Sequence, residues 1–249
     1  MIEMITWVLV ALLASVAVLL AVLWAAPWLN RPFWRLVLGP RYRRLVFGLE
    51  HLPTHGPGLV VANHVTWIDG FLLVASCPRR IHFLINADIV NAFALTRWVA
   101  SRTGLIPVPS SGPRAQRAAI EAARAALDAG HMVGVFPEAQ LSRNGRMNTF
   151  LRGLEAIHKN REHIPVIPVA LGNLWGSNFS FSGGYCLGKR PQGLRRTVVI
   201  VFGAPMAGPV TAACARQAVL ELTVKAHALC PPNSRSKKPP DCDLSLPCW

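Results

Sequence analysis

Ala62-Asn63-His64-Val65-Thr66-Trp67-Ile68-Asp69-Gly70, in which four residues separate a histidine from an aspartate, directly follows the apolar run Gly58-Leu59-Val60-Val61. That run predicts a short buried strand, and a strand that ends in a polar turn is where an α/β protein usually carries its chemistry. A neutral imidazole can take a proton from a hydroxyl at pH 7, and a nearby carboxylate can orient the ring. Residues five positions apart lie on different faces of a helix, so the pair needs a turn before any helix begins. Taken alone, the pair also fits a hydrogen-bonded structural histidine.

The composition points to an anionic partner. The 249 residues carry a formal net charge of +14, which favours a phosphate-bearing substrate, an acidic membrane surface or nucleic acid. No nucleic-acid motif is visible and the arginines cluster near the N-terminus, so we do not expect nucleic acid to be the partner. The six cysteines show neither a C-x-x-C pair nor zinc-ligand spacing, which favours ordinary thiols, although the two in the tail are close enough in sequence to pair.

The N-terminus is apolar and then basic. Residues 5–26 are almost wholly apolar, with Trp7 and Trp24 near the ends, which predicts a single membrane-spanning helix within an anchor over residues 1–28. A cleaved signal peptide is disfavoured because Glu3, and no Lys or Arg, precedes the run; a buried hairpin helix is the other alternative. Residues 29–44 interleave arginines with aromatic side chains, which predicts a cytoplasmic segment on anionic headgroups. We therefore expect an inner (cytoplasmic) membrane protein whose remaining chain is cytoplasmic.

From Leu45 onward, short apolar strands alternate with helices. This alternation predicts an α/β fold with a mostly parallel central sheet flanked by helices, over residues 45–229. A proline- and lysine-containing tail at 230–249 is predicted to be disordered. The expected strands are Leu45–Leu49, Leu59–Ala62, Ile81–Ile85, Leu105–Val108, Met132–Phe136, Val166–Leu171 and Thr197–Phe202. The expected helices are Ala92–Ser101, Pro113–Ala129, Arg152–Lys159 and Thr211–Leu229.

Several common enzyme motifs are missing from the sequence. It contains no G-x-S-x-G nucleophile elbow, no G-x-x-x-x-G-K-[ST] phosphate loop and no H-E-x-x-H helix. His51 and His55 flank Pro53, which predicts a loop and not a metal site. A serine acyl-enzyme hydrolase is therefore disfavoured.

Four stretches together resemble the motifs of a known family. Asn63-His64 with Asp69 resembles the first motif of the glycerolipid acyltransferases, the family that contains 1-acyl-glycerol-3-phosphate acyltransferase. Gly104-Leu105-Ile106-Pro107-Val108 resembles the second motif, Phe136-Pro137-Glu138 with Ser142-Arg143-Asn144-Gly145 the third, and Val166-Ile167-Pro168-Val169 the fourth. They occur in the family's order and cover the chain from about Leu45 to Pro205.

The resemblance implies a glycerol-phosphate acyltransferase-like fold and direct acyl transfer. His64 would be the general base on a glycerol hydroxyl and Asp69 would orient it, while Asn63, Gly104 and Glu138 would contact or approach the acceptor. The co-substrates would be a lysophospholipid acceptor and an acyl-CoA or acyl-carrier protein donor. Neither a metal nor another cofactor is implied.

The chain departs from the family pattern where the acceptor phosphate should bind. Ser110 stands where the second motif usually carries an arginine, and the third motif reads Glu138-Ala139-Gln140-Leu141 instead of Glu-Gly-Thr-Arg. Arg143 and Arg146 are the expected substitutes, with Arg114 and Arg117 as further candidates or as solvated surface charge. The third motif and the aromatic stretch after Trp175 resemble bacterial modules that reacylate lysophosphatidylethanolamine, so a larger headgroup is an alternative. A non-catalytic lipid-binding or scaffold protein that retains the fold is the alternative from another class.

Overall fold

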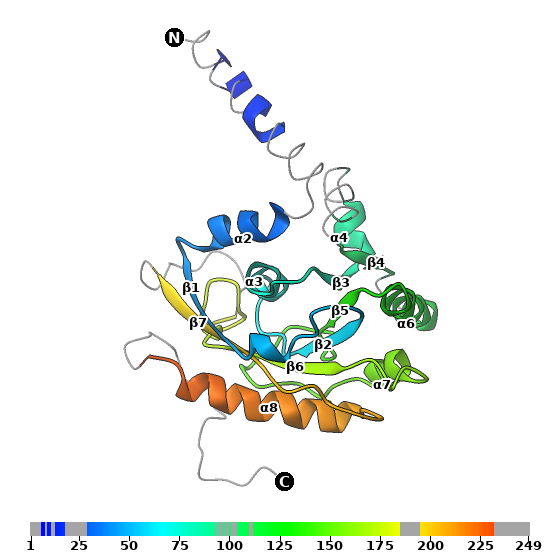
Figure 1. The fold of residues 1–249 in the computed structure, drawn as a ribbon. Helices are drawn as coiled ribbons and strands as arrows, with labels where there is room; N and C mark the ends of the chain where they lie inside the picture. The colour runs from blue at the N-terminus through cyan, green and yellow to red at the C-terminus, as the bar shows by residue number, and fades with distance from the viewer. Residues whose placement is uncertain are drawn as a thin grey trace.

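A seven-stranded sheet forms the centre of the molecule (Figure 1). The structure is a computed structural model that describes residues 6–7, 9–10, 13–17, 29–92, 94, 97, 100, 104–109, 112–184 and 195–231. The strands are β1 (Tyr42–Phe47), β2 (Gly58–Ala62), β3 (Ile81–Asn86), β4 (Ile106–Val108), β5 (Met132–Val135), β6 (Val166–Gly172) and β7 (Arg196–Phe202). All seven predicted strands are present, with ends shifted by at most a few residues.

The sheet is mostly parallel, as predicted. Its order is β1-β7-β6-β2-β5-β3-β4, and β6, β2, β5, β3 and β4 all run parallel. β7 pairs antiparallel with β6, and β1 pairs parallel with β7. The amino ends of β1 and β7 therefore lie at the same edge as the carboxyl ends of β2, β5 and β6. Loops from both halves of the chain meet at this edge.

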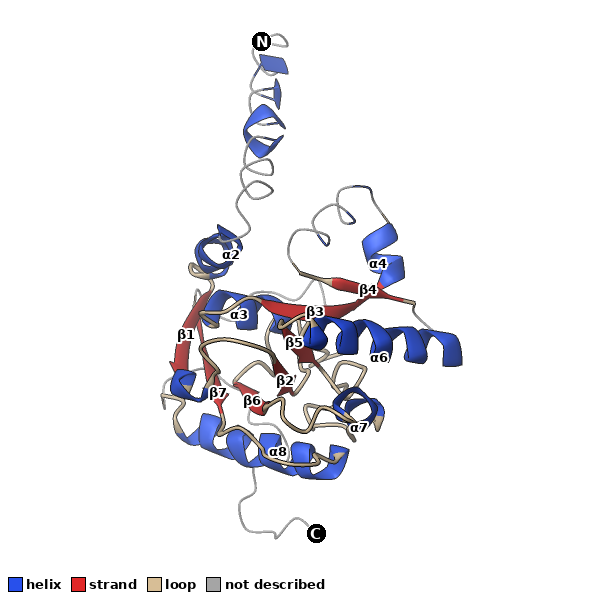
Figure 2. Cartoon of the chain, turned by 45° about the vertical axis from the view of Figure 1, so that its right-hand side comes forward, coloured by secondary structure: helices blue, strands red, loops and turns tan. Residues whose placement is uncertain are grey.

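Helices cover both faces of the sheet, which explains why its strands are nearly continuous apolar runs (Figures 1 and 2). Helices α2 (Asn30–Leu38) and α3 (Asp69–Ser76) cover one face, where residues such as Leu72 pack against Val60. Helices α6 (Pro113–Asp128), α7 (Gly153–His158) and α8 (Ala212–Ala228) cover the other, where residues such as Leu127 pack against Leu59.

Local signals explain the helix ends. Pro113 occupies the first turn of α6, and the Thr211 side chain caps α8 by accepting a hydrogen bond from the Cys214 N–H at 3.1 Å. The predictions for α6, α7 and α8 are confirmed. Helix α4 (Ala87–Asn91) was not predicted; the Asn86 side chain caps it. Most of the helix predicted at 92–101 lies outside the described residues.

The predicted interfacial segment, 29–44, packs against the domain. It forms α2, which packs on α3, and the Trp34 ring stacks on Phe71 with the ring centroids 4.1 Å apart. It also includes the start of β1, because the sheet begins at Tyr42, upstream of the domain boundary expected at Leu45. The segment is therefore tied to the sheet by backbone pairing and to α3 by aromatic contact.

The two ends of the chain fall mostly outside the described residues. In the described parts, no helix combines the length and apolarity needed to cross a membrane. Most of the predicted span at 5–26, and the tail after Pro231, are not described. Cys77, Cys214 and Cys230 are free thiols.

Candidate active site

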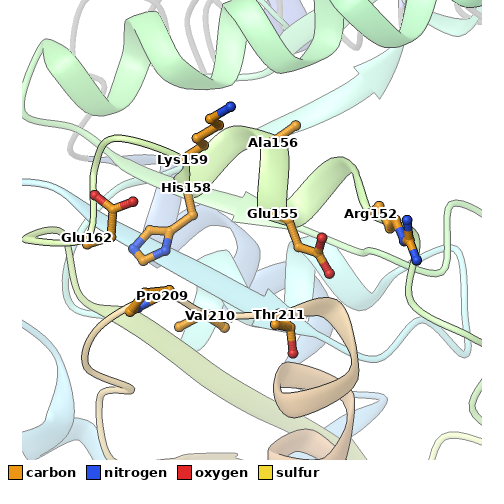
Figure 3. Close-up of a pocket in the computed structure, with 9 residues that line it drawn as sticks. All are labelled: Arg152, Glu155, Ala156, His158, Lys159, Glu162, Pro209, Val210 and Thr211. Atoms are coloured by element: carbon orange, nitrogen blue, oxygen red, sulfur yellow. The ribbon is translucent and has the colours of Figure 1, made fainter.

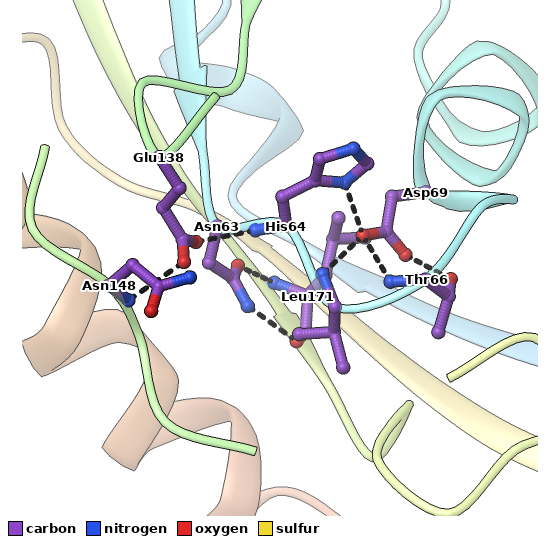
Figure 4. A network of polar contacts seen from close by, with 8 residues as sticks. Asn63, His64, Thr66, Asp69, Glu138, Asn148 and Leu171 are labelled. Carbon is purple, nitrogen blue, oxygen red and sulfur yellow. Dashed lines mark hydrogen bonds and ion pairs between the residues drawn. The ribbon is translucent and has the colours of Figure 1, made fainter. Parts of the chain in front are cut away.

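His64 and Asp69 form the pair that the sequence predicts (Figure 4). The His64 Nδ1 lies 3.0 Å from the Asp69 Oδ2; the Asp69 side chain is fully buried, whereas 22% of the His64 side chain is exposed. An ionised Asp69 accepts the Nδ1 hydrogen, and this assignment leaves the Nε2 lone pair free of the carboxylate. The pair is therefore arranged so that the outer nitrogen of the ring can accept a proton.

The turn between the two residues holds the carboxylate in place. The backbone N–H groups of Val65 and Thr66 donate to the Asp69 Oδ2 at 2.6 and 2.9 Å, and the Thr66 hydroxyl donates to Oδ1. Asp69 is the first residue of α3, where a negative charge is favoured by the helix dipole. This is the turn that the five-residue separation requires, and it makes Asp69 rigid.

Glu138 supports the backbone of the histidine. Its Oε1 accepts a hydrogen bond from the His64 N–H and its Oε2 one from the Asn148 N–H, both at 2.7 Å (Figure 4). Only 3% of Glu138 is exposed. Burial raises the pKa of the Glu138 carboxyl, and the two N–H donors oppose this shift. Both oxygens are thus engaged with backbone, and contact with the acceptor stays a prediction.

Asn63 joins two strand ends. Its Nδ2 donates to the Leu171 carbonyl at 3.1 Å and its Oδ1 accepts from the Leu171 N–H at 2.8 Å, which extends the pairing of β2 with β6. The side chain is buried and directed into the protein. The structure therefore gives Asn63 a positioning role in the fold, and its predicted contact with substrate has no support from this geometry.

A stacked aromatic ring is a part of the site that the sequence did not reveal. The Phe136 ring lies parallel to the His64 imidazole, with centroids 4.1 Å apart and an interplanar angle of 14°. Phe136 directly follows β5, which is the parallel neighbour of β2, so the two strands end side by side. That adjacency was the missing information, because Phe136 was predicted as the last residue of a strand and as the first residue of the third family motif, without a contact to His64.

The loop that carries Arg143 and Arg146 lies next to His64. The Ser142 N–H donates to the His64 carbonyl at 3.0 Å, and the Ser142 hydroxyl accepts from the Gly145 N–H and donates to the Arg146 carbonyl. Both arginines are exposed. The Arg143 guanidinium carbon lies 4.0 Å from the centre of the Phe181 ring, so this cation contacts the aromatic loop. The structure thus brings both predicted arginines into the neighbourhood of His64.

Gly104 is not brought to His64, which corrects the expectation that it allows close approach beside the site. A Cβ at Gly104 would lie 3.0 Å from the Arg80 Nε and 3.2 Å from the His82 Nδ1. The strand register explains this, since His82 is level with Leu59, well before β2 ends. Ser110 lies outside the described residues, and Arg114 and Arg117 are exposed on α6.

A separate hollow lies away from His64. A cavity of about 420 Å³ lies between α7 and the start of α8 and is lined by residues such as Glu155, His158 and Val210 (Figure 3). Glu155 accepts a hydrogen bond from the first N–H of α8, and the His158 ring forms a hydrogen bond with the Ile164 carbonyl. Both polar groups therefore stabilise the fold. No three His, Cys, Asp or Glu side chains of the described chain gather as metal ligands.

Comparison with known proteins agrees with this arrangement. The family model described as "Acyltransferase" matches residues 43–172. Chloroplastic 1-acyl-sn-glycerol-3-phosphate acyltransferases of Arabidopsis thaliana and Brassica napus are 28% and 29% identical over 133 residues, 53% of this chain. The matched part spans only 36% and 38% of their lengths.

A solved structure supports the fold. The crystal structure of the 1-acyl-sn-glycerophosphate acyltransferase PlsC from Thermotoga maritima superimposes with a TM-score of 0.58 and 22% identity. The match covers 78% of this chain and 75% of that chain. At this identity, the likeness shows a common fold.

Proposed function

Because the chain belongs to the acyltransferase family, whose model matches over half of it, we propose that it is a membrane-bound O-acyltransferase. It moves a fatty acyl group from acyl-CoA or acyl-carrier protein to the free hydroxyl of 1-acyl-sn-glycerol-3-phosphate or another lysophospholipid. The observation that carries the proposal is the His64–Asp69 pair, with a buried, fully bonded carboxylate and a partly exposed imidazole.

The reaction follows from that geometry. The His64 Nε2 takes the proton of the acceptor hydroxyl while the hydroxyl oxygen forms a bond to the thioester carbonyl carbon. The Asp69 carboxylate stabilises the imidazolium that results. When the tetrahedral intermediate collapses, the carbon–sulfur bond breaks and the leaving thiolate takes the proton from Nε2. No covalent enzyme intermediate is needed.

Two kinds of acceptor headgroup fit the proposal. Relatives named 1-acyl-sn-glycerol-3-phosphate acyltransferases favour a phosphomonoester acceptor. The altered third motif at residues 138–141 favours a larger headgroup, because the arginine expected there is absent. The exposed Arg143 and Arg146 beside His64 are the side chains best placed to bind the acceptor phosphate in either case.

The membrane is the expected source of the acceptor. Besides the apolar run at 5–26, support comes from α2, where Leu36 is 76% exposed, and from Trp67, which is 53% exposed in the turn that follows His64. Large apolar side chains exposed beside a reactive residue fit contact with lipid. We place the protein in the inner membrane as a single-pass protein with its domain in the cytoplasm, where an anionic surface meets the basic segment.

Acyl transfer by the purified chain tests the proposal. Radiolabelled acyl-CoA and acyl-carrier protein are supplied in turn with a panel of lysophospholipids, and the product lipid is measured. His64→Ala should lower the rate by about 10²–10⁴-fold, the typical contribution of a general base. His163→Ala, which changes an exposed histidine remote from the pair, should keep full activity.

Two outcomes would count against the proposal. Undiminished transfer by His64→Ala would refute the mechanism. Headgroup-selective lipid binding without turnover for any donor or acceptor would instead favour a lipid-binding scaffold that retains the family fold, an alternative motivated by the altered third motif.

A further inference from the structure

Four arginines from three separate parts of the chain gather beside α2. Arg31 and Arg35 are four positions apart on α2 and therefore share one face of the helix. Arg44 lies on the same face of β1 as Tyr42 and Val46, which pack in the core beneath α2 and α3. Arg195 directly precedes β7, whose first residue is level with Tyr42. We call Arg31, Arg35, Arg44 and Arg195 the α2 arginine cluster.

The cluster concentrates positive charge, and no ion pair with an acidic side chain of the described residues offsets it. Burial lowers the pKa of Arg44, and the nearby charges of Arg35, Arg31 and Arg195 lower it further, so these side chains are close enough to repel one another. Neither ion pair found in the described chain includes any of them. An arrangement of like charges of this kind is stabilised when an anion binds among them.

Two arginines of the cluster also have buried hydrogen-bond donors that lack an acceptor in the described chain. The Nε of Arg31 and the Nη1 of Arg44 are buried, as is the Nη1 of the neighbouring Arg41, and no group among the described residues accepts a hydrogen bond from any of the three. A buried donor attached to a charged group is costly when it has no acceptor. A phosphate offers several acceptor oxygens and matches the planar geometry of guanidinium groups.

Other arginines near this edge have different contacts, although the Nη1 of Arg41 is also a buried donor without an acceptor in the described chain. Arg196 is buried and its Nη1 donates to the carbonyls of Asn173 and Trp175, and the Arg41 guanidinium carbon lies 5.6 Å from the centre of the Tyr42 ring. Arg43 is exposed and alternates with Arg44 along β1, so it points to the opposite face of the sheet. The cluster is therefore a defined subset of the basic residues, and Arg43 is its natural control.

From this geometry we infer that the α2 arginine cluster is a binding site for the phosphate of an anionic membrane phospholipid, separate from the catalytic pair. The inference rests on the proposed function, since it assumes that this edge of the domain faces a membrane. Leu36 and Val37 are exposed on α2 beside the cluster, which supplies apolar surface next to the phosphate site. Chemically, the site takes a phosphodiester at the headgroup level and not a reacting molecule.

The spacing of the strands indicates that a phosphate bound at the cluster is not the phosphate of the acceptor. β1 and β2 are three strand positions apart, which corresponds to about 14 Å between their backbones. In a lysophosphatidate, only a few bonds separate the reacting hydroxyl from the phosphate. An acceptor whose hydroxyl reaches His64 therefore keeps its phosphate near His64, and the cluster is left for a second lipid.

A binding experiment on the full chain tests the inference. The protein is held in a neutral detergent and phosphate-free buffer, and its unfolding temperature is followed during titration with dihexanoylphosphatidylglycerol. Dihexanoylphosphatidylcholine, inorganic phosphate and free CoA are titrated in parallel. Arg44→Gln and Arg195→Gln are compared with Arg43→Gln, because each of the three removes one positive charge.

We expect phosphatidylglycerol to raise the unfolding temperature of the parent chain at lower concentrations than the other three compounds do. Arg44→Gln and Arg195→Gln should each need at least about tenfold more of it for the same rise, while Arg43→Gln should stay within about twofold. An equal loss in Arg43→Gln would refute the site, because net charge alone would then explain binding. Equal stabilisation by inorganic phosphate, or tighter arginine-dependent binding of CoA, would refute the assignment to lipid.

The test is independent of turnover. His64→Ala should bind phosphatidylglycerol as the parent chain does, even though it is expected to lose acyl transfer. Loss of the proposed activity with intact, Arg44-dependent lipid binding would leave the site standing. Normal acyl transfer with lipid binding that does not depend on Arg44 would reject the site and leave the proposed function standing.

Discussion

Glu138→Gln is the substitution that best separates two roles for the buried carboxylate. If Glu138 contacts the acceptor, as the family resemblance implies, its loss should weaken acceptor binding. If it holds the His64 backbone, as its two 2.7 Å hydrogen bonds indicate, its loss should weaken the chemical step. Glutamine has nearly the same shape and keeps one acceptor oxygen, but its amide group would face a backbone N–H.

The size of the effect follows from these contacts. Losing one hydrogen bond to a charged group costs about 1.5–3 kcal/mol and leaves a buried N–H without an acceptor. Removing a buried charge offsets part of this cost, because burial already raises the pKa of Glu138. We expect a net loss of about 2 kcal/mol, which corresponds to a fall of roughly 4–8 °C in the unfolding temperature of a chain of this size.

The kinetic effect should be similar in free energy to the effect on stability. Displacement of a catalytic group by about 1 Å costs on the order of 10²-fold in rate. We therefore expect kcat to fall by about 10–10²-fold in Glu138→Gln while KM for the lysophospholipid stays within about twofold. Steady-state acyl transfer at saturating donor, with the acceptor varied, gives both values.

Glu162→Gln is the matched control, because it makes the same change at an exposed position and should alter neither parameter. A rise of about tenfold in the acceptor KM with kcat unchanged would refute the positioning role, since it is the signature of a lost binding contact. It would restore the acceptor contact that the resemblance implies.

Three further substitutions test the structure around the site. Asn63→Ala should cost about 2–3 kcal/mol, because it removes both buried hydrogen bonds to Leu171; an unchanged urea midpoint would contradict this. Gly145→Ala should cost about 1–3 kcal/mol, because φ is +86° and the new Cβ would lie 2.8 Å from the Trp175 ring; an unaltered near-ultraviolet tryptophan spectrum would contradict the predicted clash. Burial lowers the pKa of His82 from 6.5 to about 4, so the stability it contributes is present above pH 6.5 and is lost as the pH falls towards 4. His82→Asn should remove about 2 kcal/mol of this pH dependence, measured as urea midpoints at pH 7 and 4.5, and an unchanged slope would show that the ring is not desolvated.

What could be predicted from the sequence was local. Short apolar runs predicted every strand, because strands covered on both faces read as nearly continuous apolar stretches. The His64–Asp69 pair was also predicted, since a turn of four intervening residues can form without help from the rest of the chain. Both predictions rest on residues that are neighbours in sequence.

What could not be predicted depends on strand order and register. The hydrogen bond from His64 to Glu138 spans 74 positions and those between Asn63 and Leu171 span 108. Nothing local to these residues states that β5 and β6 flank β2. The missing register also explains why the prediction for Gly104 was wrong. The family resemblance associates Gly104 with the site, but the register of β4 on β3 places it against His82.

The reversal of β7 connects the two proposed sites. Had β7 run parallel to β6, the amino ends of β1 and β7 would lie at the far edge of the sheet, away from His64. Because it runs antiparallel, Arg44 and Arg195 come to the edge where the β2 loop carries the catalytic pair. A domain held to a membrane by its α2 arginine cluster would thus present that same edge to the lipid, so a lysophospholipid could reach His64 with its acyl chain still in the bilayer. Arginines that bind a lipid phosphate on β1 and α2, three strand positions from β2, would then act on the orientation of the domain, and their loss should affect activity on membrane-embedded acceptors more than on monomeric ones.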